Sequence, residues 1–385
     1  MTTTLEILDR LISFPTVSRS SNRDLIAYVT GLLDGAGIAW ELAESADGSR
    51  ANLFATVGPK EGKGVVLSGH TDVVPTEGQA WSRDPFRLHS ENGKLYGRGT
   101  TDMKGFVAAA ISASLKAAAL PLRTPLHLAL SYDEEIGCVG VRDLLANLKT
   151  RQSRPFLCIV GEPTGMRIAT GHKGKLALRA CCTGRAGHSA LAPRALNALH
   201  LGADFIGVLR GEQHRLAMSG TRDDAYDIPY STIHAGVMRG GSALNIVPEC
   251  CEVDFEIRNL AADDPREIVA RITEGAEAIA APLLDEFPEA VVKIKEINAY
   301  PGLDTPEDSE IVNLLRRLGV RKDPFKVAFG TEAGLFHTEL GMAAAICGPG
   351  DMAQGHKADE YIEMAQMEAC DTMLLRLVQI MRHGL

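Results

Sequence analysis

Short apolar runs, each followed by turn, acidic or histidine residues, most constrain the fold of this chain. Four of them read VVLSGH (65–70), LHLALSYDEE (126–135), FLCIVGEP (156–163) and MAAAICGPG (342–350). Runs this continuous are typical of strands that are buried on both faces of a sheet. Helical stretches lie between them, such as the alanine-rich segment 103–119. The alternation predicts an α/β domain with a mostly parallel sheet.

The middle of the chain predicts a second, smaller domain. Strand-like and helix-like segments follow one another there in the order β-α-β-β-α-β, which is that of a ferredoxin-like unit. Asp264 and Pro265 are a favourable N-cap and first residue for the second helix. We therefore expect an α/β domain made of residues 1–172 and 297–385, interrupted by an α+β domain of residues 173–296.

Composition narrows the class of protein. With 385 residues, 45% of them hydrophobic and 23% charged, the chain has the makeup of a globular protein with a large core. A net charge of −9 argues against nucleic acid and an anionic membrane as partners. No secretory signal is evident, and the eight cysteines show no C-x-x-C spacing. We expect a cytoplasmic protein with reduced thiols.

Side chains of the kind that bind metals recur next to the predicted strands. In open α/β sheets the ligand crevice lies beyond the carboxyl ends of the strands, so these side chains are expected to converge there. Any one of them alone is explained as a cap or a solvated loop residue. Together they form the mixed imidazole and carboxylate set that favours zinc over magnesium. In chain order they are His70, Asp72, Asp102, Asp133, Glu134, Glu135, Glu162 and His356.

A series of ordered motifs carries a family resemblance over essentially the whole chain. They read SGHTDVVP, LYGRGTTDMKG, DEE, GEPT, GHKGK, GRAGHSA, NIVPE and GHKADEYI. In this order they resemble the di-zinc deacylases, a family that includes acetylornithine deacetylases, succinyl-diaminopimelate desuccinylases and aminoacylase or carboxypeptidase relatives. The resemblance implies a zinc-peptidase-like catalytic domain and an inserted lid and dimerisation domain.

The resemblance also implies how two divalent ions would be bound. Asp102 matches the carboxylate that bridges both ions, with His70 and Glu162 on one of them. Glu135 and His356 match the remaining ligands of the other ion. Zinc is the leading candidate, and the ligand set would also accept cobalt or manganese.

Three further residues match catalytic positions of the family. A water held between the ions would attack the amide carbonyl, and Glu134 matches the general base that takes its proton. Asp72 matches the carboxylate that orients His70. His188 matches a donor to the tetrahedral oxyanion that is supplied by the lid of a partner subunit, which implies a homodimer.

The substrate is indicated by one loop and two lid residues. The loop FGTEAGLFHTELG (329–341) resembles that of acetylornithine deacetylases, although Gly330 stands where the family has cysteine. We expect Thr331 and Glu332 to contact the substrate, with Glu332 facing a cationic tail. Asn245 and Arg258 match the residues that grip the substrate's α-carboxylate.

The expected reaction is hydrolysis of N2-acetyl-L-ornithine to L-ornithine and acetate, in arginine biosynthesis. The nearest alternative is a related deacylase acting on other N-acyl amino acids, N-succinyl-diaminopimelate or small dipeptides. Two alternatives come from other classes: a non-catalytic relative that binds ligands, and an α/β protein whose carboxylates are only structural.

Overall fold

The chain divides into two compact units. A computed structural model describes residues 2–151 and 155–385. Unit 1 comprises Met1–Gly171, Leu303–Lys326 and Thr331–Leu385, and unit 2 comprises His172–Gly302 and Val327–Gly330. The sequence predicted an α/β domain of residues 1–172 and 297–385 and an inserted domain of residues 173–296.

Unit 1 is built on a nine-stranded sheet with a parallel centre. The neighbours β6, β3, β7 and β17 pair in parallel, whereas β1, β2 and β8 pair antiparallel at the flanks. The predicted fold class is confirmed. The strand order is β1 (Ala39–Glu44), β2 (Ala51–Val57), β6 (Leu126–Ser131), β3 (Val65–His70), β7 (Leu157–Pro163), β17 (Ala343–Gly348), β8 (Ala169–His172) and β15 (Leu303–Asp304), with β16 (Phe325–Val327) beside β8.

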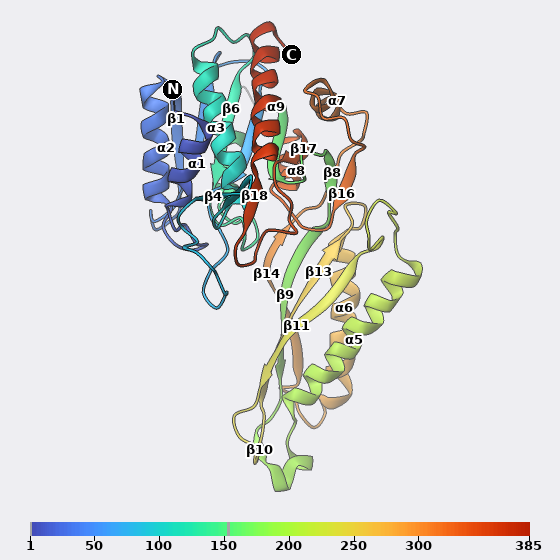
Figure 1. Cartoon of the computed structure of the whole chain (residues 1–385). Coiled ribbons are helices and arrows are strands. Elements are labelled where there is room, and N and C mark those ends of the chain that lie inside the picture. The colour runs from blue at the N-terminus through green and yellow to red at the C-terminus, as the bar shows by residue number, and fades with distance from the viewer. Residues whose placement is uncertain (1, 152–154) are drawn as a thin grey trace. The chain divides into compact units, whose positions relative to one another are not determined.

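Helices cover the sheet of unit 1 (Figure 1). The central helix α3 is buried along most of its length, which explains why its alanine-rich sequence shows little polar face. A capping box between Thr3 and Glu6 starts α1. The helices are α1 (Thr4–Ile12), α2 (Arg23–Gly35), α3 (Gly105–Ala118), α4 (Val141–Lys149), α7 (Glu310–Arg317), α8 (Ala333–Leu340) and α9 (Met364–His383).

Two glycines, Gly161 and Gly348, allow close packing at the centre of the sheet. A Cβ on Gly161 of β7 would lie 1.9 Å from ring atoms of Phe106 on α3. A Cβ on Gly348 of β17 would lie 2.0 Å from the carbonyl oxygen of Gly161. Glycine at both positions therefore allows α3 and β17 to approach β7 closely. Gly161 immediately precedes the candidate ligand Glu162.

A small antiparallel sheet and one short helical segment complete unit 1. The small sheet has the order β18 (Tyr361–Glu363), β5 (Lys94–Tyr96) and β4 (His89–Glu91). The segment η1 (Thr100–Lys104) precedes α3 and contains Asp102 in a non-helical conformation. It thereby turns the chain abruptly at the point where a candidate ligand is presented.

Unit 2 has the ferredoxin-like order expected from the sequence. Its antiparallel sheet runs β11-β13-β9-β14, and α6 begins at the predicted N-cap Asp264 with Pro265 in its first turn. The elements are β9 (Gly174–Thr183), β10 (Gly187–His188), η2 (Ser189–Arg194), α5 (Ala198–Ser219), β11 (Thr232–Gly240), β12 (Ile246–Val247), β13 (Cys250–Asn259), α6 (Pro265–Ala280), η3 (Ala281–Leu283) and β14 (Val291–Tyr300).

Two general features concern the whole described chain. Every one of the eight cysteines is a free thiol. Among residues 2–151 and 155–385, no helix combines the length and the apolar character needed to cross a bilayer.

Candidate metal centre

One carboxylate, that of Asp102, is shared by two groups of potential metal ligands. Its Oδ1 lies 3.1 Å from Nε2 of His70, and its Oδ2 lies 3.0 Å from Nε2 of His356. Ligand atoms of His70, Asp102 and Glu162 lie within 4.8 Å of one another, and so do those of Asp102, Glu135 and His356. The two oxygens of Asp102 therefore face two separate candidate sites.

The strand order explains how distant residues meet. His70 is the last residue of β3, and Glu162 lies near the end of β7, the parallel neighbour of β3. Glu135 follows β6, the other parallel neighbour of β3. Asp102 comes from η1, and His356 comes from the loop between β17 and β18. One candidate site thus has two ligands at strand ends, and the other has two ligands on loops.

Glu134, the predicted general base, lies in a tight turn beside these ligands. Glu134 is 9% exposed, and its Oε1 accepts a hydrogen bond from the thiol of Cys138 at 3.2 Å. The main-chain oxygen of Glu134 accepts from the amides of Gly137 and Cys138. These contacts fix both the backbone and the carboxylate of this residue.

Asp72 contacts His70 through its main chain and, at a longer distance, through its carboxylate. Nδ1 of His70 lies 2.9 Å from the main-chain oxygen of Asp72 and 3.6 Å from its carboxylate Oδ1. The carboxylate instead accepts from the amides of Glu134 and Glu135 and from the hydroxyl of Ser18. The main chain of Asp72 therefore contacts His70 most closely, and its side chain also holds the turn that carries Glu134 and Glu135. The predicted role of the carboxylate in orienting His70 stays a prediction.

Burial and like charges perturb the acids of this cluster strongly. Burial and the neighbouring carboxylates raise the pKa of Glu134 and that of Glu162 well above their usual range. Burial and the charge of Asp102 raise the pKa of Glu135 to about 7. Hydrogen bonds with Asp102 and Glu135 raise the pKa of His356 to about 10. Acids gathered at this density need positive charge beside them in order to ionise.

The donor set fits divalent cations. Two imidazoles and three carboxylates converge, a mixture that suits zinc, cobalt or manganese. His70, Asp102 and Glu162 are buried, whereas the side chain of His356 is 43% exposed, so the group with His356 faces solvent more directly. The residues present could therefore hold two ions that share Asp102.

Two predicted substrate residues lie in the same unit as the cluster. Thr331 is buried, and its hydroxyl accepts from the amide of Ala333 at the start of α8. Glu332 is 1% exposed, and its Oε2 accepts from the hydroxyl of Ser68. Burial raises the pKa of Glu332 to about 7.

The other three predicted residues belong to unit 2. Arg258 donates from Nε to Glu256 at 3.0 Å and from Nη1 to the hydroxyl of Tyr300 at 2.9 Å. His188 is exposed, and its Nδ1 accepts from the amide of Ala190. Asn245 is exposed, and its main-chain oxygen accepts from the amide of Ser189. Their predicted roles with the substrate stay predictions.

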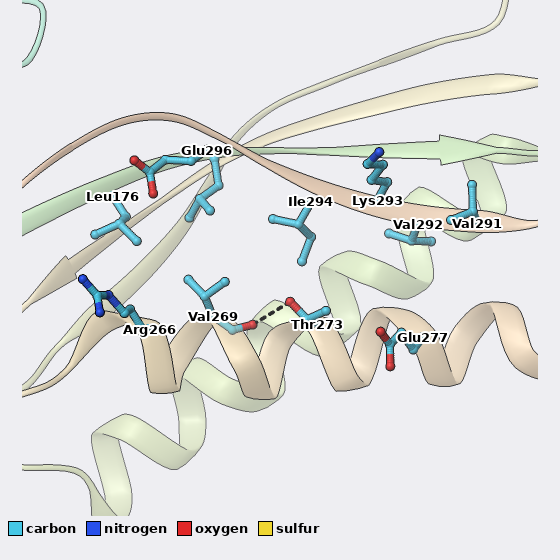
Figure 2. Close-up of a pocket in the computed structure, with 11 residues that line it drawn as sticks. Leu176, Arg266, Val269, Thr273, Glu277, Val291, Val292, Lys293, Ile294 and Glu296 are labelled. Carbon is cyan, nitrogen blue, oxygen red and sulfur yellow. Dashed lines mark hydrogen bonds between the residues drawn. The ribbon is translucent and has the colours of Figure 1, made fainter.

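A pocket of about 440 Å³ lies between α6 and β14 of unit 2 (Figure 2). Val269 and Ile294 contribute apolar side chains to it, and Arg266 and Glu277 contribute charged groups, whereas the side chain of Lys293 points away from α6 (Figure 2). None of the predicted site residues is among the described residues that line it. We therefore assign no part of the predicted chemistry to this pocket.

Sequence reasoning missed several residues that hold the cluster. Cys138 contacts the candidate base, and Glu360 accepts hydrogen bonds from the amides of Thr101 and Asp102. Glu360 stands in the motif GHKADEYI, four residues after His356. The motif was therefore visible, but a contact between a side chain and distant main-chain amides leaves no pattern in the sequence.

Ligand sets that share a carboxylate and lie beside a buried acid are typical of metal-dependent hydrolases. The model of the peptidase family M20/M25/M40 matches residues 66–380. The chain belongs to this family of hydrolases.

Individual relatives agree with that membership. The acetylornithine deacetylase of Klebsiella pneumoniae (strain 342) is 32% identical over 367 residues, 93% of this chain and 92% of the relative. The metallo-carboxypeptidase Sso-CP2 of Sulfolobus solfataricus, an M20 family protein, has the same fold, with a TM-score of 0.79 at 18% identity over 100% of both chains. The YXEP protein of Bacillus subtilis, described as a dinuclear metal binding peptidase, aligns with a TM-score of 0.71 at 12% identity over 99% and 98% of the two chains.

Proposed function

We propose that this chain is a two-metal amide hydrolase that converts N2-acetyl-L-ornithine to L-ornithine and acetate. The observation that carries the proposal is the position of Asp102, whose two oxygens face two separate groups of ligands. The likeness to acetylornithine deacetylases over nearly the whole chain supports the choice of substrate. A role in arginine biosynthesis and a cytoplasmic location belong to the same proposal.

The chain's own residues would hold the ions and move the proton. His70 and Glu162 would bind one ion and Glu135 and His356 the other, with Asp102 between them. Bound there, two divalent cations, zinc by preference, would polarise the amide carbonyl and make a water molecule more acidic.

Glu134 would transfer the proton of the attacking water to the departing amine. It is buried, and the thiol of Cys138 fixes one of its oxygens. Nearby cations would favour its ionised form and thereby counter the rise in its pKa that burial causes. The carboxylate of Asp72 would hold the main chain of Glu134 and Glu135 in place by accepting hydrogen bonds from their amides.

Unit 2 completes the proposal with three residues. Arg258 and Asn245 would bind the α-carboxylate of the substrate, for which the planar fork of arginine is well suited. His188 of a partner subunit would donate to the developing oxyanion, so the active form would be a homodimer. Replacing His188 by Ala should lower kcat by about 10²–10³, the usual effect of losing such a donor.

Substrate comparison tests the proposal. We expect kcat/KM to be highest for N2-acetyl-L-ornithine among that compound, N-acetylmethionine and N-succinyl-diaminopimelate. Much faster hydrolysis of N-acetylmethionine would reassign the chain to another deacylase of the family. The departure at Gly330 makes this comparison necessary.

A second experiment separates the enzyme from a binding protein. Glu134→Gln keeps the size of the side chain and should lower kcat by about 10²–10⁴ while the metal content stays unchanged. Turnover near the parent rate in this variant would remove Glu134 from the mechanism. A parent protein that hydrolyses no acyl amino acid would favour the non-catalytic alternative.

A further inference from the structure

The carboxylate of Glu360 grips the main chain that presents Asp102. Glu360 is 1% exposed, and its Oε1 accepts from the amides of Thr101 at 2.9 Å and Asp102 at 3.1 Å. Its Oε2 accepts from the amide of Gly99 at 3.1 Å and from Nη1 of Arg98 at 2.7 Å. Main-chain amides that are buried need such acceptors, so Glu360 fixes where the backbone of Asp102 lies.

Arg98 and Gln79 connect this grip to the loop of His356. The guanidinium of Arg98 is buried, and its Nη2 donates to Oε1 of Gln79. Nε2 of Gln79 donates in turn to the main-chain oxygen of His356 at 3.0 Å. The indole of Trp81 donates to the same Oε1 of Gln79 at 3.1 Å. Glu360, Arg98 and Gln79 thus form one connected set, here called the loop frame.

The ligands differ in how much they need such support. His70 pairs with Ser131 in the ladder of β3 and β6, and Glu162 lies in β7 next to Pro163, which pairs with Gly348 of β17. His356 lies on the irregular loop between β17 and β18, with a φ of 60° in the left-handed region. A non-glycine residue persists there only when its surroundings hold it. The hydrogen bond from Gln79 to His356 is such a restraint.

We infer that the loop frame, through Gln79, positions His356 against Asp102 and thereby sets the affinity for the ion that His356 binds. That ion is the one bound by Asp102, Glu135 and His356, whereas the ion at His70 and Glu162 depends mainly on the sheet. Glu360, Arg98 and Gln79 are positioning residues and do not touch the ions or the substrate. This inference rests on the proposed function, because it requires two ions that share Asp102.

The effect of the frame is measured by titrating the metal-free full chain with Zn²⁺ in a calorimeter. Gln79 is only partly buried, so Gln79→Ala should fold, and exposed Glu77 in the same loop provides the matched control Glu77→Ala. In Gln79→Ala we expect one of the two ions to lose about 10–100-fold in affinity, as is usual when support around a ligand is removed. The other ion of Gln79→Ala and both ions of Glu77→Ala should stay within about threefold of the parent, a change of less than 1 kcal/mol.

Measuring kcat at two zinc concentrations distinguishes a defect in metal occupancy from a general structural defect, which excess zinc would not repair. In Gln79→Ala, excess Zn²⁺ should restore kcat on N2-acetyl-L-ornithine, because the defect lies in occupancy. Glu360→Gln, which keeps the shape but removes the charge, should weaken both ions, because Glu360 holds the main chain of Asp102, which the two ions share. Equal weakening of both ions in Gln79→Ala, or no weakening of either, would overturn the inference.

The outcomes also distinguish this inference from the proposed function. A parent chain that binds two ions, with Gln79→Ala unchanged, contradicts the loop frame alone. A parent chain that binds fewer than two ions contradicts the proposed function and the inference that depends on it. A different preferred substrate would leave the titration and its interpretation intact.

Discussion

Replacing the buried carboxylate of Glu332 by an amide should stabilise the metal-free protein at alkaline pH. Glu332 lies at the start of α8, is 1% exposed, and accepts a hydrogen bond from the hydroxyl of Ser68. Burial raises its pKa from 4.5 to about 7. Glu332→Gln keeps the shape and removes a charge that the folded state accommodates poorly.

The sign and size follow from the two pKa values. Between pH 4.5 and 7 the folded state binds the proton of Glu332 and the unfolded state does not, so the parent loses stability as the pH rises through this range. A shift of about 2.5 units corresponds to about 3 kcal/mol, and most of it, about 2–3 kcal/mol, appears between pH 5 and pH 8. Because the side chain is buried, solvent screening reduces this little.

Urea unfolding at pH 5 and pH 8 measures the difference between Glu332→Gln and the parent. The advantage of the variant should grow by about 2–3 kcal/mol between the two pH values. Glu339→Gln, on the exposed face of α8, is the control and should show no such growth. A constant difference between Glu332→Gln and the parent would refute the reasoning. If Glu332 also meets the substrate's ammonium, kcat/KM should fall for N2-acetyl-L-ornithine and not for N-acetylmethionine.

Three further substitutions test separate parts of the structure. Burial lowers the pKa of His127 to about 4, so the parent should lose about 1 kcal/mol of unfolding free energy per pH unit as the pH falls from 6.5 to 5. His127→Gln should abolish this loss, as measured by urea unfolding. Gly161→Ala, whose Cβ strikes the ring of Phe106, should cost about 1–3 kcal/mol in the same assay. Cys138→Ala should lower kcat about fivefold by removing a hydrogen bond to Glu134 worth about 1 kcal/mol, and Cys138→Ser should restore most of it. Unchanged values in these three assays would contradict the corresponding contacts.

The fold was predictable because the decisive signals are local. Continuous apolar runs such as 65–70 and 157–163 became the parallel strands β3 and β7, since a strand buried on both faces has no polar positions. The order of elements in unit 2 was readable for the same reason, and Asp264 marked the start of α6. Parallel strand order then brings His70 and Glu162 to one edge of the sheet.

The support around the cluster was not predictable from the sequence. Glu360 and Gln79 act on main-chain groups that lie far along the chain, and main-chain acceptors and donors are the same for every residue type. The same reason explains Asp72, whose main-chain oxygen faces His70 while its carboxylate turns to the amides of the next turn. Whether the cluster binds metal stays a prediction.

The most direct test of the central claim is anomalous X-ray diffraction at the zinc edge from crystals grown with Zn²⁺. Asp102 presents its two oxygens to His70 and His356, so two anomalous peaks should flank its carboxylate. Their separation should be about 3.5–4 Å, as in other two-metal sites. A single peak, or peaks that leave Asp102 without a metal contact, would contradict the account.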